Sequence, residues 1–466
     1  MIDEGTMTGT SPGVAAWETI GAHLAEREAT RRQQMRHMRF DTIAVHGIYD
    51  AQAALANQGS INEPLFLSPA QHFVESDQME AALAYRMPSW TYTRIANPTV
   101  HYLEETLALL ETYGSDVQAS ACGTASGMAA VFMATEPFLI VDPSLPPTNI
   151  VASAKCYGGT FMLFSERYGR ERGIEIRWVC EPLDLDEWAS KIDAGTRFVY
   201  GEMPSNPALA VFDIPAVAAL AHDAGVPLIV DPTVATPALL RPLAMGADVV
   251  VQSLSKSLGG SGLAIGGALI ARKDIPSRVG PDGVREDFAT HVKLLPFRDH
   301  GPAMSPFNAL VTLADVRTVR SRVDRWSRGA MTVAGFLEQH PKVGAVSYPG
   351  LASFPGHEIA RRDLWLADGD EDGQPVNRYG SLMSFDVRGG HAAARRVFDG
   401  LDLVWRATDL GRIKSVATIP AISTHQQQGE DGRKLACVPS HQVRLSIGGE
   451  DPQDVIADLE RALARA

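Results

Sequence analysis

Cysteine is scarce in this sequence, and its few cysteines stand far apart. The four are Cys122, Cys156, Cys180 and Cys437. No two of them form a CxxC pair, so the sequence indicates neither a zinc site nor a disulfide framework.

Long apolar runs are also missing. No stretch of about twenty apolar residues is present that would span a bilayer. The N-terminus lacks a basic region followed by an apolar run, so we expect no signal peptide. These features predict a cytoplasmic protein that has no membrane partner.

Basic residues are too few for a protein that binds nucleic acid through charge. Lys and Arg number 42 against 55 Asp and Glu, which gives a net charge of −13. This balance argues against binding to nucleic acid or to anionic membranes. One acidic run, 368–373, begins like a calcium loop, but Tyr379 stands where that loop needs a Glu at its twelfth position. We expect a solvated loop there and no metal site.

The chain is long enough for a large core and more than one domain. It has 466 residues, of which 45% are hydrophobic, and a length prior suggests roughly three domains. Residues 1–90 are polar or poorly periodic, which predicts a partly helical leader with a disordered start, then an extended arm. The domains predicted from these shifts in pattern are 1–90, 91–300 and 301–466.

The middle of the chain alternates between apolar runs and helical patterns. Such alternation predicts an α/β domain with a mostly parallel central sheet. After residue 300 the pattern changes to a charged amphipathic helix at 317–337, strands at 379–387 and 442–447, and a final helix that Pro452 opens. This part predicts a smaller C-terminal α+β domain. The expected strands of the central sheet are 149–152, 198–200, 227–230 and 248–251.

Lys256 follows an apolar strand and precedes a Gly-rich turn. A phosphate-binding P-loop would need a Gly directly before the Lys, where Ser255 stands instead. A lysine is usually exposed, but this position favours a partly desolvated amine with a lowered pKa, which is a nucleophile. The hydroxyls of Ser253 and Ser255 are placed to bind a phosphate beside it.

Asp231 ends the preceding strand, next to the strand that leads to Lys256. An Asp after a strand is often only a turn residue. However, the carboxyl ends of strands are where open α/β sheets bind ligands. A carboxylate there would keep a pyridine nitrogen protonated, which makes pyridoxal-5′-phosphate (PLP) an electron sink.

Four weaker signals fit the same cofactor. Small residues around Gly127 open a helix whose N–H groups would bind phosphate. Tyr157 offers a ring to stack on a planar cofactor, although it also fits a simple turn. Arg94 suits a phosphate clamp. Arg444, in a predicted strand, suits a carboxylate receptor, although arginines usually face solvent.

In this order the motifs resemble the Cys/Met-metabolism (trans-sulfuration) family of PLP enzymes, from about residue 41 to the C-terminus. The resemblance implies a PLP-dependent transferase type I fold. The motifs that carry it are Tyr92-Thr93-Arg94-Ile95-Ala96-Asn97-Pro98-Thr99, Ser126-Gly127-Met128-Ala129-Ala130, Tyr157-Gly158-Gly159-Thr160, Glu202-Met203-Pro204-Ser205-Asn206-Pro207, Asp231, Ser253 to Gly260, Tyr348-Pro349-Gly350-Leu351, Ser423-Thr424-His425 and Val443-Arg444-Leu445-Ser446.

The resemblance also implies roles. Lys256 would bind PLP covalently and move protons, and Tyr157 would stack on the ring and assist the leaving group. Tyr92 and Arg94 would reach the phosphate of a neighbouring subunit, in a homodimer or homotetramer with shared sites. The other implied cofactor contacts are Asp231, Ser126, Gly127, Met128, Ser253, Ser255, Asn206 and Thr233, and the implied substrate contacts are Arg444, Asp409 and Thr424.

The chain departs from the family pattern near the substrate. Pro232 replaces the usual Asn after Asp231, and Asp409 stands where relatives mostly have Ser or Asn. An acid at 409 would repel a substrate carboxylate or bind a cationic group; alternatively, it points to solvent. Gly159 stands where methionine γ-lyases usually have Cys, which argues against that activity.

The predicted function is therefore γ-replacement on an activated homoserine, such as O-acetylhomoserine, with sulfide or a thiol in sulfur amino-acid metabolism. The substrate is a small amino acid. Among family members, the segments at 92–99 and 423–427 look most like O-acetylhomoserine sulfhydrylases. The alternative is a γ-lyase similar to cystathionine γ-lyase, which releases an oxo acid and ammonia, or a lyase for another γ-substituted amino acid. A non-catalytic PLP-binding protein and a cofactor-free interaction protein are more distant ones.

Overall fold

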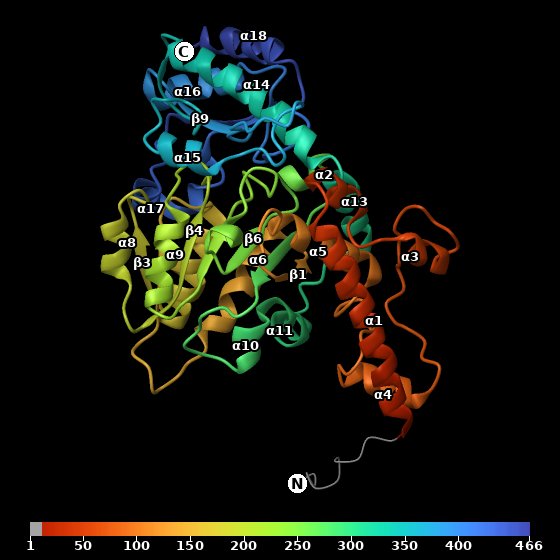
Figure 1. Cartoon of the computed structure of the whole chain (residues 1–466). Coiled ribbons are helices and arrows are strands. Elements are labelled where there is room, and N and C mark those ends of the chain that lie inside the picture. Colours follow the sequence, from red (N-terminus) through yellow and green to blue (C-terminus); the bar gives the residue numbers. More distant parts are fainter. Residues whose placement is uncertain (1–11) are drawn as a thin grey trace.

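The computed structural model describes residues 12–466, and the disordered start predicted for the leader lies outside them. A long helix, α1, opens the described chain and runs along one side of the molecule (Figure 1). Arg32 and Arg36 of α1 bind Glu105 and the carbonyls of Ser115 and Val117, which fastens the helix to the body.

The stretch predicted as an extended arm holds three short helices between irregular segments. Asp50 caps the second of them by accepting from the Ala53 N–H at 2.8 Å. The helices of this N-terminal region are α1 (Pro12–Arg36), α2 (Phe40–His46), α3 (Ala51–Ala56) and α4 (Ser76–Leu83).

A seven-stranded sheet forms the centre of the molecule, in the order β1-β7-β6-β5-β4-β2-β3. The five strands from β6 to β3 are parallel, and β7 runs antiparallel to both of its neighbours. The predicted mostly parallel sheet is confirmed, and the four predicted strands lie in or against β2, β4, β5 and β6. The strands are β1 (Ala119–Thr124), β2 (Asn149–Ser153), β3 (Glu175–Val179), β4 (Thr196–Glu202), β5 (Leu228–Asp231), β6 (Val249–Gln252) and β7 (Gly267–Arg272).

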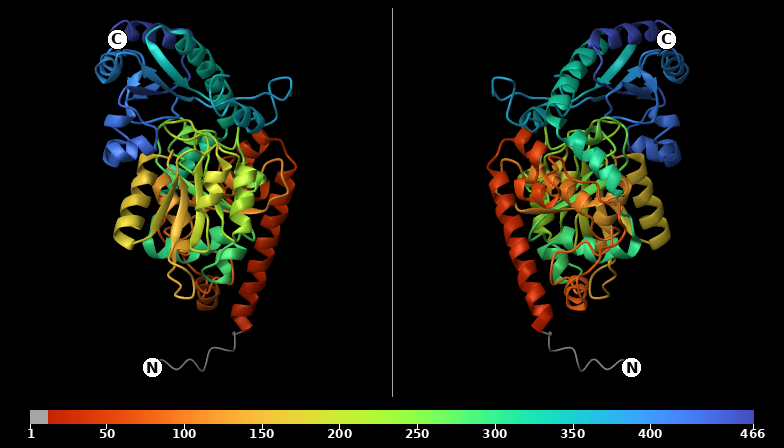
Figure 2. Two further views of the ribbon diagram at one scale, coloured as in Figure 1. Left: turned by 90° about the vertical axis from the view of Figure 1, so that its left-hand side faces the viewer. Right: turned by 90° about the vertical axis from the view of Figure 1, so that its right-hand side faces the viewer.

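Helices cover both faces of this sheet (Figure 2). Along β5 the side chains alternate: Leu228 and Val230 pack into one apolar cluster, and Ile229 packs into the other. Both faces are therefore dry, as expected for a parallel sheet with near-continuous apolar strands. The helices of this domain are α5 (Pro98–Glu111), α6 (Gly127–Thr135), α7 (Gly158–Met162), α8 (Leu185–Lys191), α9 (Ile214–Asp223), α10 (Asp282–Glu286), α11 (Phe288–Leu294) and α12 (Pro296–His300).

A second, five-stranded sheet lies in the C-terminal part of the chain, in the order β10-β11-β12-β9-β8. Helices α14, α16 and α18 pack with it around a third apolar cluster (Figure 1). The smaller α+β unit is thus confirmed, while its exact boundary at residue 300 stays a prediction. Its strands are β8 (Val343–Ser347), β9 (Leu382–Val387), β10 (Trp405–Arg406), β11 (Val416–Thr418) and β12 (Gln442–Ser446), and its helices are α14 (Val319–Gln339), α15 (His357–Asp363), α16 (Gly390–Asp399), α17 (Gly429–Leu435) and α18 (Pro452–Leu463). The helix before them, α13 (Pro306–Val316), packs against α5 in the core of the large domain.

No helix among residues 12–466 is both long and apolar enough to cross a membrane. The cytoplasmic location stays a prediction.

Candidate active site

A cavity of about 530 Å³ lies where the carboxyl ends of β4, β5 and β6 face the C-terminal domain. Both domains contribute to its wall, so residues far apart in sequence meet there. The lining residues are Ser126, Gly127, Met128, Val131, Tyr157, Thr160, Glu202, Pro204, Asn206, Asp231, Thr233, Val234, Ser253, Ser255, Lys256, Ile265, Thr408, Asp409, Leu410, Arg412, Thr424 and Arg444.

Asp231 is held in place by the turn that follows its strand. Its carboxylate accepts from the Thr233 N–H at 2.9 Å, and the Thr233 hydroxyl accepts from the Ser253 N–H at 2.8 Å. Thr233 therefore joins the end of β5 to the residue that follows β6. Burial raises the pKa of Asp231 to about 6.

Glu202 adds a second carboxyl group at the same end of the sheet. It stands opposite Asp231 on the neighbouring strand and is buried. Its two oxygens accept from the N–H groups of Tyr157, at 2.7 Å, and Asn206, at 3.2 Å. Burial, and then the negative charge of Asp231, raise the pKa of Glu202 well above its usual value. Sequence reasoning quoted Glu202 within a motif but assigned it no role.

The N-terminus of α6 forms the cavity wall beside Ser253, as predicted. Ser126 caps the helix by accepting from the Ala129 N–H at 3.1 Å. A Cβ on Gly127 would lie 2.7 Å from the Cβ of Ser253, so only glycine allows this close approach. The helix N-terminus presents its free N–H groups here, which is a favourable place for a phosphate. Ser255 also lines the cavity, but its hydroxyl is bonded to the backbone of Gly266.

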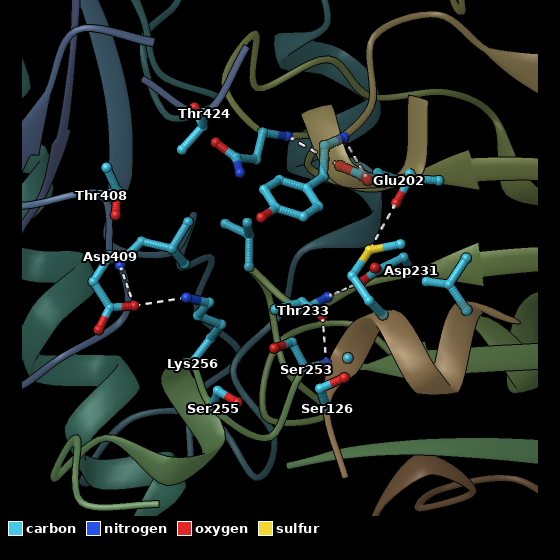
Figure 3. A pocket seen from close by; sticks show the side chains of 18 of the residues that line it. Ser126, Glu202, Asp231, Thr233, Ser253, Ser255, Lys256, Thr408, Asp409 and Thr424 are labelled. Carbon is cyan, nitrogen blue, oxygen red and sulfur yellow. Dashed lines mark hydrogen bonds and ion pairs between the residues drawn. The ribbon is translucent and has the colours of Figure 1, made fainter. Parts of the chain in front are cut away.

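The amine of Lys256 reaches the cavity and is paired with an acid from the other domain. Its Nζ lies 2.6 Å from Oδ1 of Asp409 (Figure 3). The other oxygen of Asp409, Oδ2, lies 2.5 Å from Nε of Arg412. The alternative in which Asp409 points to solvent is therefore wrong. Burial lowers the pKa of Lys256 and outweighs Asp409, which raises it. Burial would raise the pKa of Asp409, but Lys256 and Arg412 outweigh it and lower that pKa.

Arg444 is buried, not at a solvent face, although it sits in the strand β12. Its guanidinium donates to Oδ1 of Asn206 at 2.9 Å and to the carbonyls of Thr408 and Asp409, at 3.3 and 2.8 Å. Burial lowers its pKa to about 10, so it remains a cation at neutral pH. A fixed, partly desolvated guanidinium is a suitable receptor for a carboxylate.

The remaining predicted residues divide into two groups. Tyr157 and Thr424 line the cavity, and the neighbouring His425 is buried with its pKa lowered to about 4 by burial. Tyr92 and Arg94 are not among the residues that line the cavity of their own chain. They contact each other instead, with the Arg94 guanidinium 5.4 Å from the centre of the Tyr92 ring.

An amine, a carboxylate at the next strand end and a helix N-terminus around one cavity define an α/β enzyme that uses PLP. The sequence profile of the Cys/Met metabolism PLP-dependent enzymes matches residues 41–464. The chain belongs to this family.

Curated relatives and solved structures agree with that assignment. O-acetyl-L-homoserine sulfhydrylase of Corynebacterium glutamicum is 35% identical over 91% of this chain and 97% of that protein. L-methionine gamma-lyase of Porphyromonas gingivalis is 33% identical over 93% and 99%. A structure from Campylobacter jejuni that contains N′-pyridoxyl-lysine-5′-monophosphate has a TM-score of 0.80 and 33% identity, covering 92% of this chain and 100% of that one.

The groups present fit PLP. The space between Gly127 and Ser253, which a Cβ on residue 127 would fill, suits the phosphate; we call it the phosphate cradle. Asp231 suits the pyridine nitrogen. The aldehyde of PLP requires an amine as nucleophile, and Lys256 places one in the cavity.

Proposed function

We propose that the protein catalyses γ-replacement on an activated homoserine, such as O-acetylhomoserine, with sulfide or a thiol. The carrying observation is that the Lys256 amine and the Arg444 guanidinium face one cavity, with Asp231 at its end. Lys256 and Asp231 are the cofactor groups, and Arg444 holds the α-carboxylate of an amino acid. The name of the relative from Corynebacterium glutamicum supports this class of substrate.

Each step is assigned to groups of this chain. PLP, when bound, supplies an electron sink for the negative charge that develops at the substrate Cα. Arg444 fixes the α-carboxylate and thereby aims Cα at Lys256. The Lys256 amine then takes the Cα proton and moves a proton at Cβ, which allows the γ-substituent to leave. The Tyr157 hydroxyl assists its departure. Sulfide or a thiol then adds at Cγ.

We propose that the remaining residues of the cavity contact three parts of the bound molecules: the phosphate of PLP, its ring and the substrate. Ser126, Gly127, Met128, Ser253 and Ser255 surround the phosphate. Asn206 and Thr233 position groups around the ring, because Asn206 holds Arg444 and Thr233 holds Asp231. Thr424 lies on the substrate side.

Elimination without replacement, as in a γ-lyase, is the second candidate. The relative from Porphyromonas gingivalis carries the name of such an activity. Gly159 argues against it, since methionine γ-lyases usually have Cys there. A Cβ at this position would lie 2.5 Å from Cε1 of the Tyr157 ring and 3.1 Å from Sδ of Met128, so the ring would have to move before a Cys fitted.

We also propose that the active unit is a homodimer, or a homotetramer built from such dimers. Tyr92 and Arg94 would complete the phosphate site of the partner, since neither lines the cavity of its own chain.

The test is a substrate panel on the purified, PLP-loaded protein, read by product mass. With O-acetylhomoserine and sulfide, we expect homocysteine and acetate, and neither from Lys256→Ala. If sulfide makes no difference and the products are an oxo acid and ammonia, the protein is a γ-lyase and the proposed γ-replacement is wrong.

A further inference from the structure

Asp409 lines the cavity at a position where the chain departs from the pattern expected of its family. We propose that the ion pair between Asp409 and Arg412 makes the γ-subsite electrically neutral, and so selects an uncharged γ-substituent over an anionic one. The inference rests on the proposed function and narrows its substrate class: esters of a monocarboxylic acid, such as acetyl, are preferred to esters that keep a free carboxylate, such as succinyl.

Asp409 lies between two cations that come from different domains. Lys256 stands just before η4 (Ser257–Gly259) of the large domain, and Arg412 belongs to the loop that precedes β11. The Asp409 carboxylate bonds to both, at 2.6 and 2.5 Å. Figure 3 shows the carboxylate directed at the Lys256 amine across the cavity.

Arg412 is the lasting partner of this acid. When Lys256 is bonded to the cofactor, its nitrogen is held by that bond and no longer offers Asp409 the three N–H donors of a free ammonium group. Arg412, in contrast, keeps its charge and is fixed in position. It donates to the Gly259 carbonyl at 3.2 Å, and its side chain is 16% exposed. The pair therefore persists in the loaded enzyme with a net charge of zero.

The pair lies beside the reacting part of the substrate. The backbone carbonyl of Asp409 accepts from Arg444 at 2.8 Å, so the acid is next to the group that holds the α-carboxylate. Lys256, which must serve the substrate from Cα towards Cγ, touches the same acid. A γ-substituent thus begins within reach of the Asp409–Arg412 pair.

The charge of the pair decides what it accepts. A free Arg412 would be a natural receptor for a second carboxylate on the substrate. Asp409 occupies its Nε and repels that carboxylate. Every substrate carries the same α-carboxylate, so the effect of Asp409 on that group cancels when two substrates are compared.

The experiment compares O-acetylhomoserine with O-succinylhomoserine in the PLP-loaded enzyme. Asp409→Asn, Arg412→Gln and the double variant are assayed with sulfide for kcat/KM. Dissociation constants of both esters are measured by calorimetry in a Lys256→Ala background, with and without Asp409→Asn, which reads binding without turnover. Asp402→Asn is the matched control, since the Asp402 side chain is 92% exposed.

The wild type should prefer the acetyl ester. Asp409→Asn should raise the succinyl-to-acetyl ratio about tenfold in both measurements, as expected for one close charge contact. Arg412→Gln should lower that ratio, and the double variant should return it towards the wild-type value. A change below about threefold in Asp409→Asn, with wild-type turnover intact, overturns the inference. Failure of the wild type to convert either ester counts instead against the proposed function.

Discussion

Glu202 and Asp231 stand opposite each other on the parallel strands β4 and β5, so two carboxyl groups share one end of the sheet. Glu202 is buried and accepts hydrogen bonds from the backbone N–H groups of Tyr157 and Asn206, and Asp231 lines the cavity. Two adjacent carboxylates resist ionising together. A positive charge on a pyridine nitrogen beside Asp231 would relieve that repulsion, so the sheet end is prepared for a cationic ring.

The first prediction concerns the stability of the cofactor-free protein against pH. The folded pKa of Asp231, about 6, lies above the unfolded value of about 3.9, so the folded state binds the proton more tightly. The stabilisation is therefore present below about pH 4 and is lost as pH rises to about 6. In the wild type the free energy of unfolding should therefore fall by about 1–3 kcal/mol between these pH values because of Asp231, and in Asp231→Asn this part of the decrease should be absent. Urea unfolding at pH 4, 5, 6 and 7 measures the free energy of unfolding of both proteins. If this free energy changes with pH in the same way in both, the prediction is wrong.

The second prediction concerns the phosphate cradle at the start of α6. Gly127→Ala would place a Cβ against Ser253 and push apart two walls of the phosphate site. We expect PLP to bind about 5- to 160-fold more weakly, since overpacking of this kind costs about 1–3 kcal/mol. Equilibrium dialysis against PLP measures the dissociation constant. Gly335→Ala is the control, because nothing lies within 4 Å of its added Cβ. Equal affinities in the two variants would show that the close approach does not matter.

The third prediction concerns Lys256. Lys256→Ala should lose turnover and the covalent bond to the cofactor, because the amine is the nucleophile of the cavity. Borohydride reduction followed by peptide mapping should find the pyridoxyl label on Lys256 in the wild type. Lys434→Ala, at an exposed position, should keep the label. A label on any other lysine would refute the assignment.

The fourth prediction concerns Arg444. Arg444→Lys keeps the charge but loses the planar fork that bonds to Asn206 and to two carbonyls. We expect kcat/KM to fall by about 30- to 1000-fold, mainly through KM, while the PLP content stays the same. Arg325→Lys, on the exposed side of α14, should change neither parameter. If kcat alone falls, Arg444 acts on a step after substrate binding.

The fifth prediction concerns Tyr92 and Arg94. If they act on the partner's cavity, mixing Arg94→Ala subunits with Lys256→Ala subunits should restore up to about a quarter of the wild-type activity, since one site of each hybrid dimer regains both groups. Activity is measured after the two proteins are unfolded and refolded together, and mass spectrometry verifies the hybrids. Verified hybrids without activity would contradict a shared site.

The sheet was predictable from sequence because its signals are local. Strands such as 227–230 are apolar throughout, since parallel strands are covered on both faces, and this pattern survives any change in the loops. Asp231 and Lys256 could be brought together on the same basis, because strands that succeed each other in an α/β chain often pair. The half-buried edge strand β3 and the antiparallel strand β7 were not predicted.

The contacts across the domains were not predictable. Asp409 and Lys256 are 153 residues apart, and no periodicity relates a loop before β11 to the end of β6. Glu202 was missed because the predicted strand ended at residue 200, two residues short of β4. Arg412 could have been found from its spacing, because it follows Asp409 by three residues, which suits an ion pair. That spacing does not reveal that Lys256 also pairs with Asp409.

The ion pair between Lys256 and Asp409 also joins the two domains of the molecule. A covalent bond from Lys256 to PLP would take the amine out of this ion pair, so binding the cofactor would exchange a contact between the domains for a contact with the ligand. Other contacts between the two domains remain at the cavity, among them Arg444 with Asn206 and Arg412 with the Gly259 carbonyl. A single amine would thus belong either to a contact between the domains or to the cofactor, but not to both at once.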